Sequence, residues 1–464
     1  MNQFDTIAAV STPHGRGGVA MIRITGSEAV AIGEKIFTPA CGTPLGAVPA
    51  AREVYGVIRM PGEDAGSPGI DDGMAVRFCA PRSFTGEDTV EITCHGGILV
   101  TQKVLEAALC AGARMAQAGE FTRRAFVNGK MKLSQAEALG AFLEAGTDGQ
   151  LKLARGGVRG RLAERTGEIY RTLRLVLTSV YAAIDFPEED LKDMSREEIA
   201  GAVSAALSEV RSLIATYRTG RAVSEGIPTV ICGRANVGKS SVYNRILGYD
   251  AAIVTEIEGT TRDVLREKAS LGRTTLLLCD TAGLRDTGDT VERLGIERTR
   301  QEIRQAGLIL AVFDRSEPLT DEDCRLADEL AAASVPVIAL WNKSDEPALA
   351  DETWLARRIA RSIAVSARTG EGFDRLSAEV DALFVDGSLE LDRDAVVTGA
   401  RQYAALCHAA EALETAVSAL EEEIPLDLCC VGIEEAAIAV GELDGRELDE
   451  EIVAEIFSRF CVGK

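Results

Sequence analysis

The first part of the chain alternates between apolar and polar positions at the spacing of strands. Short β-branched runs such as GVAMIRIT and TVEITC are separated by glycine and proline turns. Alternation with a period of two indicates strands that bury one face. We therefore expect residues 1–130 to form a compact α+β domain, with the glycine- and proline-rich stretch 61–73 as an exposed loop.

From about Lys132 the apolar positions recur three and four residues apart. Segments such as LSQAEALGAFLEA and EEIAGAVSAALSEVRSLIATY are rich in alanine, leucine and glutamate, which is typical of amphipathic helices. Pro187 is expected to break this block once, because proline lacks the amide that continues a helix. The helical pattern returns after about Asp392. Residues 131–225 and 385–464 are therefore predicted to be two parts of one helical domain.

Between these two segments the pattern changes again. Apolar runs such as TVIC, TLLLC, LILAVF and VIALW alternate with helical stretches from Ile227 to about Phe384. Continuous apolar runs joined by helices are typical of a parallel sheet with crossover helices. We expect residues 226–384 to be such a module, inserted between the two helical segments. Insertion of this kind is tolerated because the ends of a domain usually lie close together.

Length and composition limit the class of protein. At 464 residues the chain exceeds one hydrophobic core, so about two to four domains are expected. The chain is 46% apolar and 26% charged and has no run near the roughly 18 apolar residues of a membrane span. We expect a soluble protein without a membrane partner. The start of the chain lacks a signal-peptide pattern, so the cytoplasm is the expected location.

Charge and cysteine content exclude two further classes. The formal net charge of −22 argues against a surface that wraps nucleic acid by bulk electrostatics, which requires many cationic contacts to phosphates. An RNA partner would have to bind a local basic patch or a second, more basic protein. The 11 cysteines show no metal-ligand spacing, so most are expected to be buried apolar residues.

A phosphate-binding motif follows the first apolar run of the central module. Residues 233–240, Gly-Arg-Ala-Asn-Val-Gly-Lys-Ser, fit the pattern G-x-x-x-x-G-K-S/T between a predicted strand and a predicted helix. In this setting backbone amides surround the phosphates, the lysine adds positive charge near the β- and γ-oxygens, and the hydroxyl binds Mg²⁺. We expect Lys239 and Ser240 to take these two roles.

Three further motifs follow in the order that a guanine-nucleotide site requires. Asp280–Gly283 closes a predicted strand, where the carboxylate can hold the water shell of the metal and the last amide can sense the γ-phosphate. Asp345, in the motif 342–345, can accept two hydrogen bonds from guanine but not from adenine. Ser366–Arg368 completes the base pocket. The four motifs predict a GTPase that resembles Ras-like translation-factor GTPases.

The residue after the motif at Asp280 departs from the Ras-like pattern. Ras-like proteins commonly carry a glutamine there that orients the attacking water, whereas this chain has Leu284. Glu292, in the acidic stretch that follows, is our choice for orienting the water. From its residue type alone, Glu292 would equally be a solvated glutamate at the start of a helix.

Asn236 and the loop that contains Gly-Thr-Thr-Arg-Asp at 259–263 permit a monovalent cation beside the phosphates. Such a cation would stabilise developing charge as an arginine does. From the residues alone, Asn236 would equally be a turn former. Thr261 is expected to complete the Mg²⁺ shell.

Several blocks outside the central module resemble one known family. The start of the chain and the blocks at 83–97, 119–138 and 182–190 each resemble a block of the MnmE/TrmE tRNA-modification GTPases. The terminal Phe-Cys-Val-Gly-Lys resembles the end of the same family. The likeness covers essentially the whole chain. The terminal motif is specific because a frayed C-terminus ordinarily carries no pattern. The departures are mild: His14 and Val462 stand where the family often has proline and isoleucine.

The resemblance implies a fold class. The protein would be multidomain α/β and α. It would have an N-terminal α+β domain similar to tetrahydrofolate-binding domains, which dimerises, a discontinuous helical domain, and an inserted Ras-like P-loop GTPase domain.

The resemblance also implies an activity and partners. Potassium-dependent GTP hydrolysis, together with the FAD-dependent partner MnmG (GidA), would add a carboxymethylaminomethyl or aminomethyl group to carbon 5 of the wobble uridine of certain tRNAs. The protein would be a homodimer that forms a heterotetramer or larger complex with this partner. Its cofactors would be GTP, Mg²⁺, K⁺ and 5-formyl- or 5,10-methylene-tetrahydrofolate, which supplies the one-carbon unit.

Roles for individual residues follow from the motifs and the resemblance together. Glu292 and Cys461 would act in catalysis, although a cysteine is by type more often inert. The Mg²⁺ ligands would be Ser240 and Thr261, and the K⁺ ligands would be Asn236, Thr255, Ile257 and Thr260. The folate would be bound by Arg23, Glu91, Lys130 and Lys464, although Arg23 and Glu91 by themselves look like polar residues on the solvated face of strands. The residues expected to contact GTP are Asn236, Val237, Gly238, Lys239, Ser240, Ser241, Thr255, Glu256, Ile257, Glu258, Gly259, Thr260, Thr261, Asp280, Thr281, Ala282, Gly283, Asn342, Lys343, Asp345, Ser366, Ala367 and Arg368.

Two other classes of protein are the alternatives to a tRNA-modification GTPase. A ribosome-assembly or regulatory GTPase that only binds RNA would carry a basic, aromatic RNA-binding module such as a KH domain, and the acidic sequence offers no clear one. An inactive scaffold is opposed by the intact phosphate, metal and base motifs.

Overall fold

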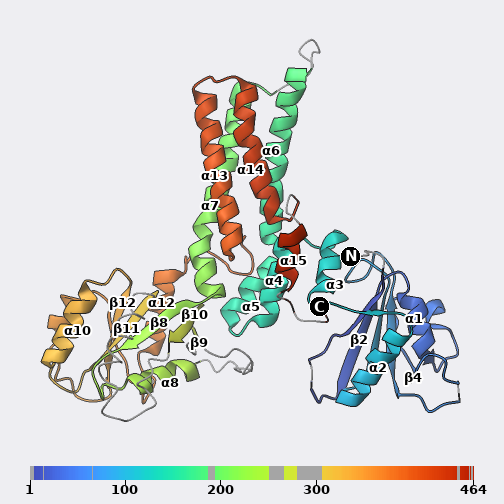
Figure 1. Ribbon diagram of the computed structural model, residues 1–464. Helices are drawn as coiled ribbons and strands as arrows, with labels where there is room; N and C mark the ends of the chain where they lie inside the picture. Colours follow the sequence, from blue (N-terminus) through green and yellow to red (C-terminus); the bar gives the residue numbers. More distant parts are fainter. Residues whose placement is uncertain are drawn as a thin grey trace. The chain divides into compact units, whose positions relative to one another are not determined.

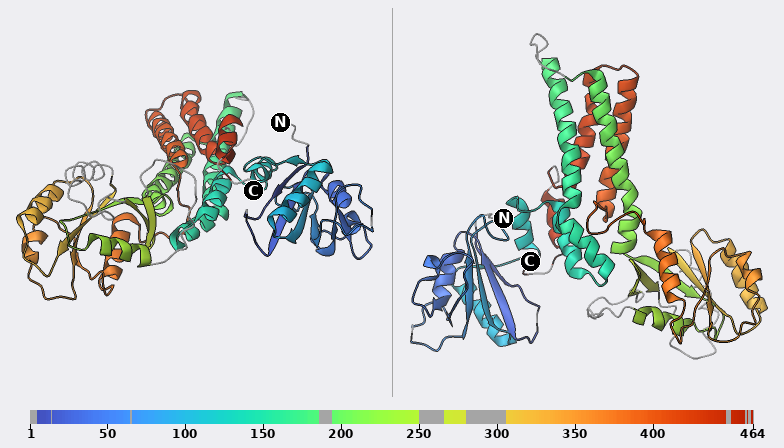
Figure 2. Two further views of the ribbon diagram at one scale, coloured as in Figure 1. Left: turned by 60° about the horizontal axis from the view of Figure 1, so that its bottom comes forward. Right: turned by 180° about the vertical axis from the view of Figure 1, so that it is seen from behind.

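The computed structural model describes most of the chain (Figures 1 and 2). The described residues are 5–13, 15–64, 66–185, 194–249, 266–279, 306–446, 450–458, 460 and 463. The chain divides into two compact units, Met1–Gly140 with Asp444–Lys464, and Ala141–Leu443.

The first unit is built on a sheet whose described strands lie in the order β3-β4-β5-β6-β2-β1-β7. The strands are β1 (Ile7–Val10), β2 (Val19–Thr25), β3 (Phe37–Pro39), β4 (Val54–Ile58), β5 (Asp71–Phe78), β6 (Thr89–His95) and β7 (Arg114–Met115). All neighbours are antiparallel except β1 and β7, which are parallel. In β2, Ile22 and Ile24 are fully buried, and Arg23 between them points to the opposite face of the sheet.

Residues of two helices, α1 (Ala29–Ile36) and α2 (Ile98–Cys110), cover the face of this sheet that carries Ile22 and Ile24. The helices of the unit are α1 (Ala29–Ile36), the 3-10 helix η1 (Leu45–Ala47), α2 (Ile98–Cys110), α3 (Glu120–Val127), α4 (Leu133–Glu144), which runs into the second unit, and α15 (Glu450–Ser458). Ile32 of α1 and Val104 of α2 share one buried cluster with the two strand isoleucines. The expected α+β fold of the first part of the chain is confirmed.

The end of the chain packs within this same unit. Val453 and Phe457 of α15 lie in a buried cluster with Leu133 and Ala136 of α4. This grouping divides the chain at residues 140 and 444. The domain boundaries expected from the sequence stay predictions.

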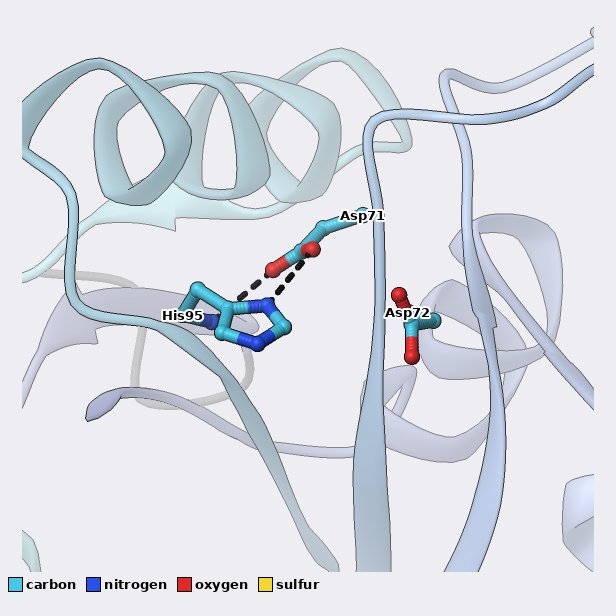
Figure 3. Close-up of side chains that lie close together, drawn as sticks. All are labelled: Asp71, Asp72 and His95. Atoms are coloured by element: carbon cyan, nitrogen blue, oxygen red, sulfur yellow. Dashed lines mark hydrogen bonds and ion pairs between the residues drawn. The ribbon is translucent and has the colours of Figure 1, made fainter. Parts of the chain in front are cut away.

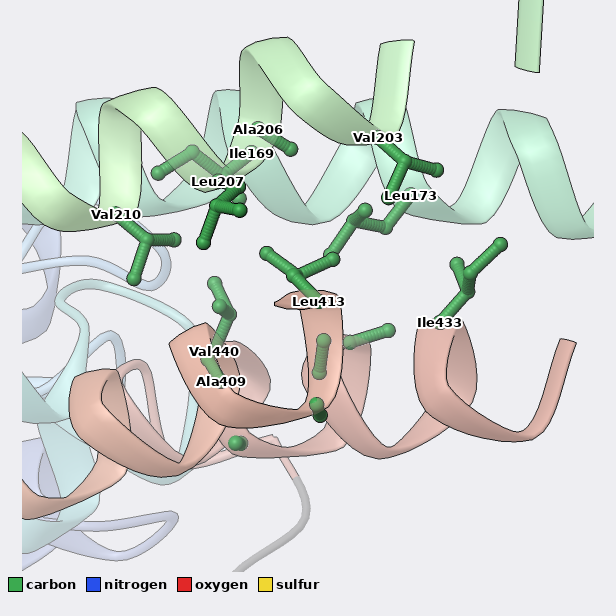
Figure 4. Packing of buried hydrophobic residues seen from close by; sticks show 14 of the residues in the cluster. Ile169, Leu173, Val203, Ala206, Leu207, Val210, Ala409, Leu413, Ile433 and Val440 are labelled. Atoms are coloured by element: carbon green, nitrogen blue, oxygen red, sulfur yellow. The ribbon is translucent and has the colours of Figure 1, made fainter. Parts of the chain in front are cut away.

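Four long helices of the second unit form a bundle (Figure 4). They are α6 (Arg161–Asp185), α7 (Arg196–Ser224), α13 (Ala400–Glu421) and α14 (Leu426–Leu443). Leu173, Val203, Leu413 and Ile433, one from each helix, belong to a common buried cluster. The helical segments before and after the central module therefore share one core, and the expected discontinuous helical domain is confirmed. Pro187, the predicted helix breaker, lies outside the described residues.

One described helix, α7, is long and apolar enough to span a membrane by length and composition. The mean hydropathy of its most apolar window is 1.2. Val203 and Val210 of this helix are buried in the core of the bundle, and the core helices of globular proteins pass the same test. The helix is therefore only weak support for a membrane span.

The rest of the second unit centres on a sheet whose described strands lie in the order β13-β12-β11-β8-β10-β9. The strands are β8 (Ile227–Cys232), β9 (Arg266–Leu271), β10 (Thr274–Cys279), β11 (Leu308–Asp314), β12 (Val337–Asn342) and β13 (Ser362–Ala364). All neighbours are parallel except β9 and β10, which are antiparallel. The predicted parallel sheet is confirmed.

Helices cover both faces of this sheet. The remaining helices of the second unit are α5 (Asp148–Val158), α8 (Lys239–Tyr249), α10 (Asp321–Ala331), α11 (Glu352–Ala356) and α12 (Phe373–Phe384). In β11, Leu310 and Val312 share a buried cluster with side chains of α8 and α12, whereas Ile309 and Phe313 share one with side chains of α10 and α11. Burial on both faces explains why this strand is a continuous apolar run.

Candidate functional site

The phosphate-binding motif forms the turn between β8 and α8. Gly233, Asn236 and Gly238 have φ values of +151°, +65° and +94°, and glycine alone adopts this left-handed region without cost. A Cβ on Gly238 would lie 2.2 Å from Nδ2 of Asn342. The second glycine of the motif is therefore required both by the backbone conformation and by the close approach of Asn342.

Lys239 and Ser240 begin α8. Nζ of Lys239 donates a hydrogen bond over 2.7 Å to the carbonyl oxygen of Arg234 in the same loop. Burial lowers the pKa of Lys239. Ser240 and Ser241, in the first turn of the helix, are exposed. The loop thus offers an ammonium group and a hydroxyl at the start of a helix, the arrangement that binds phosphate and Mg²⁺.

Asn342 joins the phosphate-binding loop to the base motifs. Its Nδ2 donates to the carbonyl oxygen of Val237 over 2.9 Å, and its Oδ1 accepts from the amide of Ala367 over 3.1 Å. The side chain is buried, so both hydrogen bonds are shielded from water. The phosphate-binding loop follows β8, the motif of Asp345 follows β12, and the motif of Ser366 follows β13. All three lie at the carboxyl ends of parallel strands, where ligands bind in open α/β sheets. The structure therefore brings these three sequence motifs together.

Asp345 is poised to accept hydrogen bonds from a base. Oγ of Ser366 donates to Oδ1 of Asp345 over 2.6 Å, and the guanidinium of Arg368 forms an ion pair with the other oxygen. The hydrogen bond from Ser366 is the main cause that lowers the pKa of Asp345, so the carboxylate is ionised near neutral pH. A carboxylate so held can accept from N1–H and the amino group of guanine.

Lys343, in the same motif, is tied to the end of β11. It has a φ of +63°, and its Nζ donates to Oδ2 of Asp314 over 2.5 Å. Asp314 is 4% exposed. Burial raises the pKa of this carboxyl, but the hydrogen bonds from Lys343 and Ser316 outweigh that effect and lower it. The ion pair fixes the loop that carries Asp345.

Other residues predicted for this site lie outside the described residues. They are Thr255, Glu256, Ile257, Glu258, Gly259, Thr260, Thr261, Asp280, Thr281, Ala282, Gly283 and Glu292. The described part of β10 ends at Cys279, directly before Asp280. The proposed roles of these residues in binding potassium and Mg²⁺ and in hydrolysis stay predictions.

In the first unit, Arg23 and Glu91 form a shielded ion pair. They are direct partners in the antiparallel register of β2 and β6, and Nε of Arg23 donates to Oε1 of Glu91 over 2.8 Å. Their side chains are 18% and 15% exposed. They are therefore not the ordinary solvated strand residues that their types suggest.

Two phenylalanines that the sequence did not single out flank this ion pair. The Arg23 guanidinium lies 5.5 Å from the ring centre of Phe84 and 5.7 Å from that of Phe121, which is within cation–π range. Phe121 is fully buried, and Phe84 is 37% exposed. Both belong to sequence blocks on which the family resemblance rests, which is the only signal that could have pointed to them.

The remaining predicted folate residues are placed only in part. Nζ of Lys130 donates over 2.8 Å to the carbonyl oxygen of Pro81, three residues before Phe84. Lys464 and Cys461 lie outside the described residues. The described Gly463 accepts a hydrogen bond from Oγ of Ser11 over 3.0 Å, and Ser11 directly follows β1.

A second polar cluster of the first unit lies at the start of β5 and the end of β6 (Figure 3). Asp71, Asp72 and His95 place ligand atoms within 4.8 Å of one another, the spacing of a metal site. The carboxylate of Asp71 accepts from the amide of His95 over 2.8 Å and contacts its Nδ1 at 2.9 Å. The contact between the Asp71 carboxylate and the imidazole raises the pKa of His95. Asp72 accepts instead from the hydroxyl of Tyr55 over 2.7 Å. These contacts explain the cluster without a metal.

The chain is similar to known proteins over its whole length. Residues 6–130 match the family described as GTP-binding protein TrmE N-terminus, and residues 133–461 match the family described as MnmE helical domain. Curated proteins named tRNA modification GTPase MnmE include that of Symbiobacterium thermophilum, which is 42% identical over 462 residues, 99% of each chain. The protein of the same name from Bacillus subtilis is 38% identical over 466 residues, 99% of this chain and 100% of that one.

Among solved structures, the chain is similar to Era in complex with MgGDPNP and nucleotides 1506–1542 of 16S ribosomal RNA. The TM-score is 0.28 at 23% identity, over 40% of this chain and 65% of that one, which is too low to carry an argument. The two family matches and the full-length relatives carry the assignment: the chain belongs to the MnmE (TrmE) family.

Proposed function

We propose that the protein is a GTPase that acts in tRNA modification. The observation that carries the GTPase part is the buried amide of Asn342, which joins the phosphate-binding loop at Val237 to the base motif at Ala367. The tRNA part rests on the full-length relatives named tRNA modification GTPase. The same names disfavour the alternative of a ribosome-assembly or regulatory GTPase.

In this function each motif residue has a separate task. Lys239 contacts the β- and γ-phosphates, Asp345 selects guanine, and Ser240 with Thr261 holds Mg²⁺. The metal supplies positive charge to the phosphate oxygens. The exposed hydroxyl of Ser240 beside Lys239 fits this role.

Hydrolysis is assigned to groups that replace the usual water-orienting glutamine. Leu284 cannot orient water, so Glu292 takes this role, and a K⁺ ion bound at the site would supply positive charge beside the phosphates. The K⁺ ligands are Asn236, Thr255, Ile257 and Thr260. In support, Asn236 lies in the phosphate-binding loop itself, in a left-handed conformation.

The pair Arg23 and Glu91 is proposed to bind a tetrahydrofolate derivative. A carboxylate and a guanidinium offer an acceptor and donors to the polar edge of a pterin, and Phe84 offers an apolar face beside them. Lys130 and Lys464 would pair with the carboxylates of the folate tail. The folate would supply the one-carbon unit, and Cys461 would take part in its transfer.

A second protein completes the proposed reaction. A homodimer of this chain would act with the FAD-dependent protein MnmG, in a heterotetramer or larger complex in the cytoplasm, to modify carbon 5 of the wobble uridine. The net charge of −22 supports a partner that carries the basic tRNA-binding surface.

The tRNA function is tested by mass spectrometry of tRNA nucleosides. Cells that lack this protein, and cells that lack MnmG, are expected to lose the same modification at carbon 5 of the wobble uridine. Complementation with wild-type protein restores it, whereas Cys461→Ser restores GTP turnover but not the modification. An unchanged nucleoside profile in the deletion strain would exclude the tRNA function.

Base selection is tested by Asp345→Asn. The amide donates where the carboxylate accepted, so we expect GTP affinity to fall about 100-fold and affinity for xanthosine triphosphate to rise. Fluorescence titration measures both. Glu346→Gln, the exposed neighbour, is the matched control and should bind GTP as wild type does. Retained preference for GTP in Asp345→Asn would contradict the assignment of Asp345.

The cation is tested by GTP turnover in KCl and NaCl at equal ionic strength. We expect faster turnover in K⁺ and loss of this stimulation in Asn236→Ala, because an electrostatic group at the phosphates is worth on the order of 10²-fold. Equal rates in both salts, or stimulation that survives Asn236→Ala, would refute the cation site.

The role of Glu292 is tested by Glu292→Ala. This variant should have lower GTP turnover and nearly intact nucleotide affinity.

The folate site is tested by calorimetric titration with 5-formyl-tetrahydrofolate. Arg23→Ala should weaken binding at least about tenfold, because it removes charge-assisted hydrogen bonds. Arg52→Ala, at an exposed position of the same unit, should bind as wild type does. If both variants bind equally, Arg23 has no part in the site.

A further inference from the structure

Arg234, the second residue of the phosphate-binding loop, is fixed by carboxylates from outside the loop. Its Nε donates to Oδ2 of Asp323 over 3.1 Å, and its Nη2 donates to Oε2 of Glu317 over 2.5 Å. The side chain of Asp323 is 3% exposed and that of Glu317 is 57% exposed. One ion pair is therefore shielded from water and the other is screened by it.

Asp323 is itself held in place by the start of α10. The amide and the hydroxyl of Thr320 both donate to Oδ2 of Asp323, over 3.0 and 2.7 Å, and the amide of Asp323 donates to Oγ1 of Thr320 over 3.3 Å. This reciprocal capping box sets the position of the carboxylate. The rigid end of a helix is thus connected through one oxygen atom to the phosphate-binding loop.

Arg234 also contacts Lys239, the lysine proposed to bind phosphate. Nζ of Lys239 donates to the carbonyl oxygen of Arg234, so the position of the Arg234 peptide decides where the ammonium group lies. Two residues further on, Asn236 has a φ of +65°, a conformation that costs a residue with a side chain free energy and persists only where its surroundings hold it. The loop therefore needs support from outside.

We propose that Asp323 is a positioning residue for phosphate recognition: through Arg234 it holds the loop so that Lys239 meets the β-phosphate. The inference rests on the proposed GTP binding. It gives a role in the nucleotide site to a residue that lies in none of the four sequence motifs.

The test compares the affinities of the full-length protein for GDP and for guanosine. Asp323→Asn keeps an oxygen that accepts from Thr320 but removes the charge that pairs with Arg234. We expect GDP affinity to fall about tenfold and guanosine affinity to stay the same, because guanosine has no phosphate to meet Lys239. Glu317→Gln, which alters only the exposed ion pair, should change both affinities by less than about threefold. Calorimetry measures GDP, and ligand-detected NMR measures guanosine.

A double-mutant cycle separates positioning from general stability. If Asp323 acts through Arg234, then Arg234→Gln should lose as much GDP affinity as Asp323→Asn. The double variant, which carries both substitutions, should lose no more than either single variant. Three results would each overturn the proposal. The first is additive losses of GDP affinity in the double variant, and the second is unchanged GDP affinity in Asp323→Asn. The third is an equal loss of GDP and guanosine affinity together with a lower melting temperature. Wild-type protein that binds no GDP would instead overturn the proposed GTPase function.

Discussion

The nucleotide site depends on the buried side-chain amide of Asn342. Its two hydrogen bonds reach Val237, 105 residues away in the sequence, and Ala367, 25 residues away. A buried amide that lost one of these partners would leave an unpaired polar group, which costs about 1–3 kcal/mol. The phosphate-binding loop and the base pocket are therefore held in one geometry by a residue that lies between them.

Buried carboxylates extend the same principle to the charged groups of the site. Asp314 and Asp323 lie at the end of β11 and the start of α10, and they pair with Lys343 and Arg234. These two cations belong to the base motif and to the phosphate motif. The end of β11 and the start of α10 thus anchor both loops through carboxylates that are themselves buried. An acidic chain uses two of its carboxylates here to fix cations in the two loops.

The sequence predicts the architecture well because its signals are local. The run LILAVF is continuous because β11 is buried on both faces, and the glycines of the phosphate-binding loop are required by their backbone angles. Such constraints act within a few residues and leave a readable pattern. The order of the four motifs adds the guanine-nucleotide function without any tertiary information.

The contacts that sequence reasoning missed are set by tertiary structure. Arg23 and Glu91 are 68 residues apart, and only the register of β2 with β6 makes them partners. Phe84 reaches the same place from a loop, and Asp323 reaches Arg234 from the start of a helix. Asp323 lies in no motif, and Phe84 is marked only by the sequence block that contains it, because the role of each residue depends on where another segment packs.

The central claim, that these motifs form one guanine-nucleotide site, is tested most directly by calorimetric titration of the wild-type protein with GDP and with ADP in the presence of Mg²⁺. We expect GDP to bind at one site for each chain and ADP to bind at least about 100-fold more weakly, since adenine cannot donate to Asp345 as guanine does. Equal affinity for the two nucleotides, or no binding of GDP, would contradict the claim.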